Sequence, residues 1–459
     1  MSLSCLLIAV TSFFVGDSSW PGFLGTGRTE VDPSTIPVQW SPHENQAWSK
    51  TITGYGQSSP VIWNDFVYVT TVDGAMKDRL ITTALRLSDG ELIWEKFIDT
   101  SDLVQNGTFV SRAAPTPVVD QHGLVCFFES GDLVAYSHSG EELWKTSLSQ
   151  KYGKFQNEYG LAASPVLFEN LLILLIDHPG PSYVIALDRN TGEQIWKTDR
   201  TSRGSWSSPM IFDAPGGAQL LCSSAGTIDG YDLRSGQLLW TFDGVGGNRI
   251  CSPMSSGEGA FLIGAQTSRE FPDKESVKRS NFRMRVSKDG DQWKPEVIWR
   301  TEEASPGMAS PIAHGGCSYW INRTGAVFCF DTETGKLHYT ERIKQSPWAT
   351  PFALGDRIYV FGKDGLTTVI AAGPAFQILA ENQLWDPELI KPDQSIIDRE
   401  TDPKRKAGAA MHTLPEVSGA AVVSGSLVLR TGNTVYCIRP ENSAVERSGS
   451  SGTAEAQAE

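Results

Sequence analysis

The sequence predicts an all-β protein, an eight-bladed β-propeller whose blades are four-stranded antiparallel sheets. Three observations lead to this fold class. Glycine and proline are abundant, with 44 and 25 of the 459 residues, which indicates many turns. A tryptophan, or once a tyrosine, recurs behind a turn at intervals of 40 to 59 residues. A Ser-Pro or Thr-Pro pair opens an apolar run in each interval, and short strands repeating with this period are typical of propeller blades.

The N-terminal apolar stretch, residues 3–16, is too short to cross a bilayer as a helix and has the length of a signal-peptide core. We expect residues 1–16 to be a signal peptide, followed by a lead-in segment over 17–35, so that the protein is periplasmic or secreted. The alternative is an N-terminal strand or apolar extension. No other stretch has membrane-spanning length. We therefore expect a soluble mature chain without a transmembrane segment.

Two markers recur with a fixed phase between residues 36 and 440, the region that we assign to the propeller. The first marker comprises Trp48, Trp94, Trp144, Trp196, Trp240, Trp299, Tyr339 and Trp385. The second is the Ser/Thr-Pro pair, with its proline at Pro60, Pro117, Pro165, Pro209, Pro253, Pro311 and Pro351. In five cases the interval from the first marker to the next proline is 12 or 13 residues. We interpret the prolines as structural, because proline fits the first residue of a strand.

The two ends of the repeat region are predicted to meet. The last repeat supplies only three strands after Pro415, whereas residues 46–51 carry Trp48 in the outer-strand position but precede the first Ser/Thr-Pro pair. Pairing of these two segments closes the ring and removes an exposed sheet edge. The small polar residues of 441–459 predict a disordered tail.

Two segments around the recurring tryptophan carry a family resemblance. ALDRNTGEQIW at 186–196 and GYDLRSGQLLW at 230–240 resemble the tryptophan-docking motif of the PQQ-like (pyrroloquinoline quinone repeat) β-propeller family, and SWPGFLGTGR at 19–28 resembles the N-terminal segment of its bacterial exported members. The resemblance implies that all eight residues of the first marker form a structural belt, each packed against the docking motif of the next blade. A buried indole suits this role because its N–H can donate to a carbonyl group.

The long loops are predicted to lie on one face of the ring. In an up-and-down blade, alternate connections lie on opposite faces, and the long ones here are residues 97–113, 147–162, 177–182, 266–280 and 386–417. Only the turn at 287–296 is long on the other face. Because binding residues concentrate in loops on rigid scaffolds, we expect a binding face here. The alternative is harmless variation in loop length.

Residues just before the Ser/Thr-Pro pairs are predicted to ring the mouth of the axial channel on that face. They are Tyr55, Gln57, Arg112, Tyr159, Trp206, Arg249, Met308 and Trp348. Aromatic rings and two arginines at one pore have the chemistry to clamp a planar anionic ligand. The alternative for each residue is a channel plug or packing between blades.

The predicted function is a non-enzymatic, monomeric scaffold that binds a protein partner or a small ligand. The net charge of −14 argues against a nucleic-acid partner, and the histidines show no metal-ligand spacing, so we expect neither a metal site nor catalytic residues. The resembled family includes both non-enzymatic scaffolds and quinoprotein alcohol dehydrogenases, which use PQQ and calcium. Those enzymes place a disulfide of adjacent cysteines over the quinone, and no two cysteines are adjacent here.

A PQQ-dependent oxidoreductase with PQQ and calcium as cofactors therefore remains the alternative function, with Glu158 or Asp177 as its candidate carboxylate. Cys317 and Cys329 flank the turn at 322–325, where they are either a disulfide across a hairpin or buried free thiols.

Overall fold

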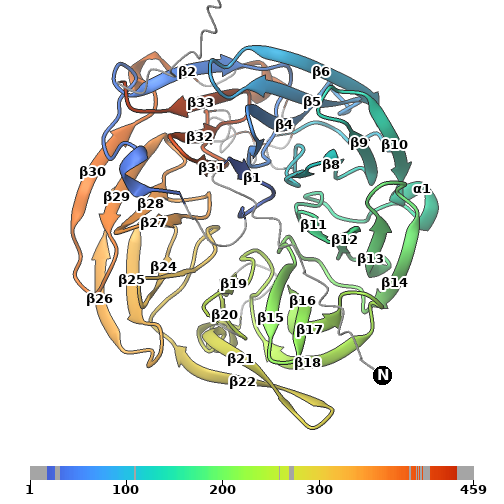
Figure 1. Ribbon diagram of the computed structural model, residues 1–459, viewed down its shortest axis with the longest axis vertical. Helices are drawn as coiled ribbons and strands as arrows, with labels where there is room; N and C mark the ends of the chain where they lie inside the picture. The colour runs from blue at the N-terminus through green and yellow to red at the C-terminus, as the bar shows by residue number, and fades with distance from the viewer. Residues whose placement is uncertain are drawn as a thin grey trace, which may run out of the picture.

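The computed structural model describes residues 18–25, 31–107, 110–257, 259–267, 273–391, 394–399, 401, 403, 406 and 414–441. The predicted signal peptide, 1–16, and all of the predicted tail except Glu441 lie outside these residues. Within them, strands form eight four-stranded sheets arranged as blades around one axis (Figure 1), which confirms the eight-bladed propeller.

Each blade runs from an inner strand at the axis to an outer strand at the rim. Blade one consists of β3 (Val61–Trp63), β4 (Phe66–Asp73), β5 (Arg79–Arg86) and β6 (Leu92–Asp99). Blade two consists of β7 (Val118–Asp120), β8 (Gly123–Phe127), β9 (Asp132–Tyr136) and β10 (Glu142–Ser147). Blade three consists of β11 (Val166–Phe168), β12 (Leu171–Ile176), β13 (Ser182–Asp188) and β14 (Gln194–Arg200). Blade four consists of β15 (Met210–Ala214), β16 (Gly217–Ser224), β17 (Gly226–Asp232) and β18 (Leu238–Val245).

The second half of the ring repeats this order. Blade five consists of β19 (Met254–Ser255), β20 (Ala260–Ile263), β21 (Asn281–Asp289) and β22 (Gln292–Thr301). Blade six consists of β23 (Ile312–His314), β24 (Cys317–Ile321), β25 (Ala326–Asp331) and β26 (Leu337–Arg342). Blade seven consists of β27 (Phe352–Leu354), β28 (Arg357–Phe361), β29 (Leu366–Ala371) and β30 (Ile378–Gln383). Blade eight consists of β31 (Gly419–Val423), β32 (Ser426–Arg430), β33 (Thr434–Ile438) and, from the other end of the chain, β2 (Gln46–Thr51).

The pairing of β2 with β33 closes the ring as the repeat pattern predicts. The two strands are antiparallel, with Gln46 opposite Ile438 and Thr51 opposite Thr434. A further two-residue strand, β1 (Ser19–Trp20), adds to the inner strand of blade one. The chain between the lead-in segment and β2 packs on blade seven, where Trp40 stacks on Tyr359 with ring centroids 6.3 Å apart.

Every outer strand carries a β-bulge at the residue before the belt position. In blade three, Ala186 pairs with Trp196 while Leu187 pairs with Gln194, so Ile195 is the extra residue. The corresponding extra residues are Ala47, Ile93, Leu143, Leu239, Ile298, His338 and Leu379. A bulge re-aims the side chain that follows it. The bulge therefore helps to direct the belt residue toward the neighbouring blade.

Five tryptophans of the belt contact the next blade in the same way. The Nε1–H of Trp144 donates to the carbonyl oxygen of Arg189 at 3.0 Å, and its ring lies against Gly192. The other four indoles donate to the next blade's carbonyls in the pairs Trp48–Leu87, Trp94–His138, Trp196–Leu233 and Trp299–Thr332. Each contact spans one blade junction, so the five together join five pairs of neighbouring blades: eight and one, one and two, two and three, three and four, and five and six.

Three belt positions depart from the expected docking. The Nε1–H of Trp240 donates to Gln219 Oε1 of its own blade, because blade five replaces the short docking turn with the extended β21–β22 hairpin. Tyr339 lacks an indole N–H, and its ring meets Phe376 of blade seven edge-on. The prediction for Trp385, which followed from its spacing in the sequence, is wrong. The residue after the bulge in β30 is Ala380, and Trp385 lies beyond the end of the strand.

The Ser/Thr-Pro pairs form a second connection between blades, close to the axis. In six of the seven pairs, the residue before the proline donates its backbone N–H to the hydroxyl of the equivalent residue one blade further on. The bonds are Ser59 to Thr116 (2.9 Å), Thr116 to Ser164 (3.0 Å), Ser164 to Ser208 (2.9 Å), Ser208 to Ser252 (2.9 Å), Ser252 to Ser310 (2.9 Å) and Ser310 to Thr350 (3.2 Å). At each of these junctions the hydroxyl group thus satisfies a buried backbone N–H. The sequence analysis assigned a structural role to the proline and did not identify this role of the serine or threonine.

We expect Gly192→Ala to destabilise the protein by about 1–3 kcal/mol more than Gly290→Ala. Both glycines have a positive φ, +71° and +60°, so both substitutions carry the same backbone strain. A Cβ at Gly192 would lie 2.5 Å from the Trp144 ring, whereas a Cβ at Gly290 meets no described atom within 4 Å. Urea denaturation of both variants measures the difference, and equal losses would show that the docking contact carries no packing constraint.

Candidate functional site

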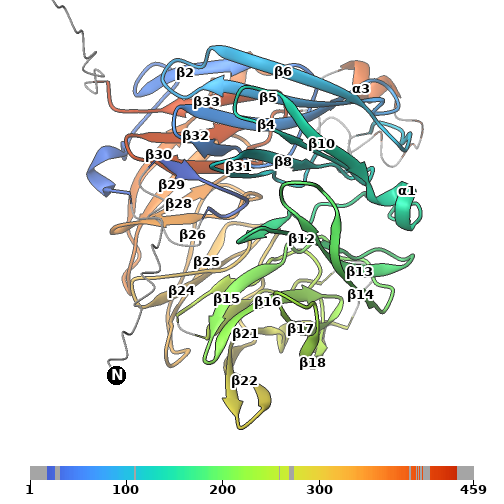
Figure 2. The same cartoon turned by 45° about the vertical axis from the view of Figure 1, so that its right-hand side comes forward.

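The two faces of the ring differ. One face, here called the loop face, carries residues 100–117, 148–165 and 384–418, which connect successive blades. Three helices lie in loops of this face: α1 (Leu148–Tyr152), α2 (Lys274–Lys278) and α3 (Gln394–Arg399). Figure 2 shows α1 and α3 on the same side of the ring. The other, the turn face, carries the β21–β22 hairpin and the short docking turns. In the described part of the chain, no helix combines the length and apolar character needed to cross a membrane.

Backbone hydrogen bonds join several of the predicted mouth residues across blade junctions. The N–H of Gln57 donates to the carbonyl oxygen of Arg112 at 2.9 Å, and the N–H of Arg112 donates to Gln57 Oε1 at 3.0 Å. The N–H of Ser111 donates to the carbonyl oxygen of Tyr159 at 2.8 Å. The segments that lead into blades one, two and three are therefore held together at the mouth.

The chain of contacts continues into blades four and five. The Trp206 backbone N–H donates to the carbonyl oxygen of Arg249 at 2.7 Å, and its indole Nε1–H donates to that of Gly160 at 2.9 Å. The rings of Tyr159 and Trp206 meet edge-on, with centroids 6.0 Å apart. Tyr159 is 40% exposed, so this aromatic pair is presented to solvent while being held in position.

Met308 and Trp348 lie in the segments that lead into blades six and seven, and both are half-buried. The Lys363 Nζ lies 5.8 Å from the Trp348 ring centroid. The hydrogen bonds described above join the segments that lead into blades one to five, and the sequence pattern did not predict these bonds.

Arg112 stands in a cluster of buried charges that the sequence did not reveal. Its guanidinium Cζ lies 3.5 Å from the ring centroid of Tyr55. Beneath it, Lys77 Nζ pairs with Glu129 Oε1 at 3.0 Å, and Glu129 Oε2 accepts from the Ala113 N–H at 2.9 Å. Lys77 and Glu129 are both less than 9% exposed. They come from different blades, so their spacing in the chain carries no signal of the pair.

Glu416, the penultimate residue of the long loop before blade eight, completes this cluster. Burial raises the pKa of its carboxyl group to about 7, while the positive charges of Lys363 and Arg112 act to lower it. Glu416 therefore titrates close to neutral pH on the loop face. The sequence analysis did not single it out, because its burial depends on how the loop returns to the ring.

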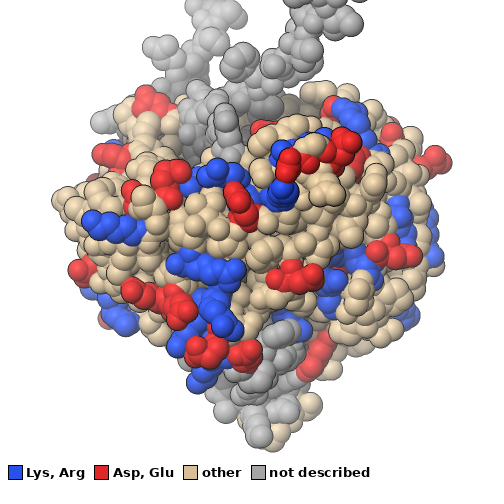
Figure 3. Space-filling view, turned by 90° about the horizontal axis from the view of Figure 1, so that it is seen from below, with Lys and Arg blue, Asp and Glu red and all other residues tan. Residues whose placement is uncertain are grey.

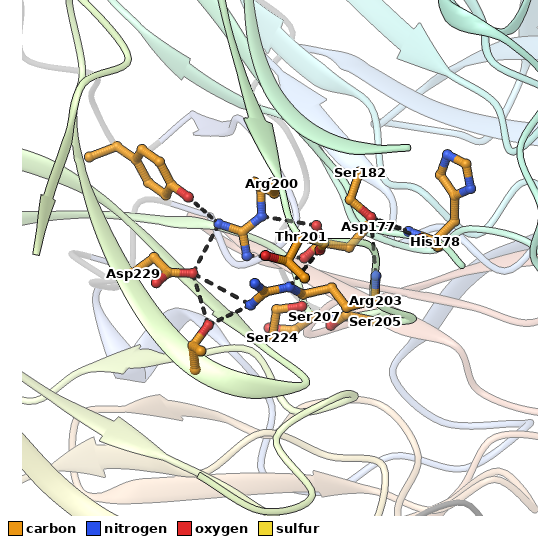
Figure 4. A network of polar contacts seen from close by, with 12 residues as sticks. Asp177, His178, Ser182, Arg200, Thr201, Arg203, Ser205, Ser207, Ser224 and Asp229 are labelled. Atoms are coloured by element: carbon orange, nitrogen blue, oxygen red, sulfur yellow. Dashed lines mark hydrogen bonds and ion pairs between the residues drawn. The ribbon is translucent and has the colours of Figure 1, made fainter. Parts of the chain in front are cut away.

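Asp177, a candidate carboxylate in the oxidoreductase alternative, is committed to an ion pair. Its carboxylate binds Arg200 through two bonds, of 2.9 and 3.2 Å, and both side chains are at most 2% exposed. Arg200 reaches on to Asp229 at 3.1 Å, and Asp229 lies 3.7 Å from Arg203 (Figure 4). The network ties blade three to blade four. Glu158, the other candidate, is exposed in the loop before blade three.

The neighbouring His178 is held as a neutral ring. Its Nδ1 accepts the backbone N–H groups of Gln156 at 3.1 Å and Gly180 at 3.0 Å. Burial lowers the pKa of His178, although the charge of Asp177 opposes this. Two N–H donors at Nδ1 leave no room for a proton there, so His178 orders the loop before blade three rather than acting as a base at this nitrogen.

A cavity lies along the axis, among the inner strands. It has a volume of about 820 Å³ and is bounded by the inner strands and by residues 20–25 of the lead-in segment. Trp20 pairs with Ile62, is buried and meets Phe352 edge-on, and the Val119 N–H donates to the Pro21 carbonyl. The eight predicted mouth residues do not line this cavity.

The cysteines of the described residues are all free and buried. The alternative of a disulfide between Cys317 and Cys329 is wrong for this structure, because β24 and β25 pair Tyr319 with Cys329 and Cys317 with Asp331. The two cysteines are diagonal rather than opposite. Among the described residues, no group of three or more His, Cys, Asp or Glu side chains is arranged to hold a metal ion.

A family model described as the outer membrane protein assembly factor BamB matches residues 26–198, 129–249 and 286–445, which is more than half of the chain. The chain belongs to this family of PQQ-like β-propellers. BamB of Burkholderia pseudomallei is 22% identical over 302 residues, covering 63% of this chain and 67% of that protein.

Two solved structures share the fold. BamB from Moraxella catarrhalis has a TM-score of 0.57 at 15% identity, covering 86% of this chain and 98% of that one. Quinohemoprotein alcohol dehydrogenase from Comamonas testosteroni has a TM-score of 0.55 at 12% identity, covering 92% of this chain and 80% of that one. At these identities the likeness concerns the fold alone, and function is decided by the site.

The mouth of this PQQ-like propeller does not fit a PQQ and calcium site. Calcium requires six to eight oxygen ligands, several of them carboxylates. Both oxygens of Glu129 are engaged by Lys77 and Ala113, and both oxygens of Asp177 by Arg200. The carboxylates near the mouth thus neutralise cations of the protein itself, and no catalytic step through a quinone follows from their arrangement.

We expect Asp177→Ala to destabilise this propeller by about 3–5 kcal/mol, because it leaves Arg200 buried without its carboxylate. Asp199→Ala is the matched control: it removes another aspartate of the same blade, paired with Lys197 but with an 84% exposed side chain. It should cost less than about 1 kcal/mol. Native stability of Asp177→Ala in urea denaturation would contradict the structural role of this ion pair.

The pKa of Glu416 predicts a pH dependence of stability. The folded protein binds this proton more tightly than the unfolded chain, whose carboxyl has a pKa near 4.5. The stabilisation is therefore complete below pH 4.5 and is lost as the pH rises through about 7, by about 3 kcal/mol in total. Glu416→Gln should lack this loss. Unfolding free energies of both proteins between pH 4.5 and 8 give the comparison, in which parallel curves would refute the assignment.

Proposed function

We propose that this protein is an exported, non-enzymatic scaffold of the bacterial cell envelope that binds a protein partner on its loop face. Family membership supports a scaffold role, since the matching relatives are named outer membrane protein assembly factors. The observation that carries the proposal is the asymmetry of the ring: the connections that contain helices lie on one face, and the mouth residues on that face are stitched together.

The chemistry of the loop face favours binding over catalysis. A general acid or base must be free to exchange a proton with a substrate. Asp177, Glu129 and Lys77 are instead bound to partners within the protein. A half-exposed Tyr159 beside Trp206 and Arg249 is the kind of surface that dominates protein interfaces, where tyrosine, tryptophan and arginine are enriched.

Two features support an envelope location. The N-terminal residues 3–16 have signal-peptide character. Burial raises the pKa of the Cys126, Cys222 and Cys251 thiols to about 12, which suppresses the reactive thiolate. Free thiols of this kind are compatible with an oxidising compartment.

Charge alone does not direct the partner to the rim. In the edge-on view of Figure 3, lysine and arginine side chains are interspersed with aspartate and glutamate. A surface of mixed sign does not steer a partner of either sign over a long distance. This favours the loop face over the rim as the binding surface.

Site-specific photo-crosslinking in living cells tests the proposal. A photoreactive residue is introduced on the loop face at Leu103, Tyr159 or Leu389, which are exposed, and on the turn face at Asn190 or Arg234 as a matched control. We expect a discrete crosslinked protein from the loop-face positions and none from the turn-face positions. Equal crosslinking from both faces, or from neither, would contradict a loop-face scaffold.

A titration with PQQ and calcium tests the oxidoreductase alternative, which rests on the shared fold of the Comamonas testosteroni enzyme. Trp206 and Trp348 lie at the mouth, so a bound quinone would quench their fluorescence. We expect no saturable quenching at micromolar PQQ. Saturable quenching that is lost in Trp206→Phe and Trp348→Phe would revive the oxidoreductase and justify an alcohol screen with artificial electron acceptors.

A further inference from the structure

The Arg112 guanidinium is buried in an arrangement that leaves part of it unused. Arg112 is only 3% exposed, and its Nε–H has no hydrogen-bond partner among the described residues. Burial lowers the pKa of Arg112, opposed by the charges of Tyr55, Glu416 and Glu129. A buried cation with an unused donor is costly to maintain, and such a group usually serves a ligand or an interface.

The Tyr55 ring fixes the orientation of this guanidinium group. It stacks on the Tyr55 ring at 3.5 Å, and the opposite side of that ring rests against Gly432, where a Cβ would collide with it. Arg430, fully buried, lies on the same side of the protein and donates to the carbonyl oxygen of Ser58. Both guanidinium groups act electrostatically on the Tyr55 hydroxyl, and their positive charges oppose the rise in its pKa that burial causes.

The backbone around Arg112 is held in a strained form. Ala113, the next residue, has φ 46°, and Lys77 has φ 50°, both in the left-handed region that non-glycine residues avoid. Glu129 accepts hydrogen bonds from the backbone N–H of Ala113 and from the ammonium group of Lys77, and so holds both residues in place. Gln57 brackets Arg112 on its other side. Strain of this kind is a mark of a preorganised functional position.

A carboxylate from the loop face already acts on Arg112. Glu416 lies within electrostatic range of both Arg112 and Lys363 and is largely buried. Arginine is well matched to a carboxylate, because two of its N–H groups can bond the two oxygens in one plane. The negative charge of Glu416 therefore favours the charged form of Arg112, as the carboxylate of a ligand would.

We infer that Arg112, through its unpartnered Nε–H, anchors a carboxylate-binding site, and that its ligand is an acidic side chain of the partner protein. The identity of the ligand as part of a protein rests on the proposed function. The exposed Tyr159, joined to Ser111 next to Arg112, gives the partner segment an apolar contact beside the charged one.

Fluorescence anisotropy with a labelled oligoglutamate peptide, blocked at both ends, tests the site directly. We expect saturable binding to the full-length protein at low salt, and an oligoglutamine peptide of the same length should not bind. Arg112→Gln should weaken binding by about tenfold or more, since it removes charge-assisted hydrogen bonds. Arg112→Lys should weaken it less, and Glu416→Gln should tighten it by removing the internal competitor.

Arg79→Gln is the matched control, because Arg79 is an exposed arginine that also lies over an aromatic ring, Phe97, on the outer part of blade one. Its affinity for the peptide should equal that of the unmodified protein, and urea denaturation verifies that every variant is folded. Equal binding by Arg112→Gln and the unmodified protein would overturn the inference, as would the absence of binding to both the unmodified protein and Glu416→Gln.

A small free dicarboxylate, glutarate, separates the sources of the ligand. Weak glutarate binding with strong oligoglutamate binding supports a protein ligand, whereas stronger glutarate binding overturns it in favour of a small molecule. Peptide binding that depends on Arg112, combined with failure of the crosslinking experiment, would leave the carboxylate site standing and refute only the proposed cellular partner.

Discussion

The closed ring is the constraint on which the rest of this structure depends. Each blade buries its two faces only against its neighbours, so the packing is complete only if the last blade meets the first. Here the closure comes from β2, a strand from the N-terminal side, which completes blade eight beside β33. Two circular sets of contacts presuppose that closure: indoles docked on the next blade at the rim, and Ser/Thr hydroxyls accepting backbone N–H groups near the axis. Both cross the blade junctions, where the sheets themselves contribute no hydrogen bonds.

Because contacts at the rim and near the axis both hold the blades together, the two faces of the ring can carry different kinds of connection. On the turn face the docking turns are short because they must fit beneath an indole ring, as Gly192 does beneath Trp144. The loop face has no such requirement, so helices and long connections accumulate there. The buried charges also lie on this side, where the Asp177 network ties blades three and four and the Lys77–Glu129 pair supports Arg112. The same groups that hold the loops in place thereby shape the surface that a partner meets.

Two buried carboxylates of this propeller are fully engaged within the protein. Asp177 and Glu129 have no oxygen left for a metal or substrate, because each is bound to a cation or backbone N–H of the protein. Glu416 is different, because burial raises the pKa of its carboxyl group to about 7. The buried cation Arg112 on the loop face suits recognition of an anionic side chain, while the carboxyl group of Glu416 on the same face can exchange a proton near neutral pH.

The sequence by itself determined the blade count, the strand order and the closure, because these follow from local signals that repeat: a turn, an aromatic residue and a Ser/Thr-Pro pair at constant spacing. It also identified Arg112, Tyr55, Gln57 and Tyr159 as neighbours at one mouth, since equivalent positions of successive blades must meet there. It misjudged Trp385 and Trp240, whose docking depends on a bulge position and on the shape of the next blade's turn. Only the tertiary structure decided the Lys77–Glu129 ion pair, the burial of Glu416 and the pairing of Asp177 with Arg200, because contacts between residues far apart in the sequence leave no mark in the spacing of one chain.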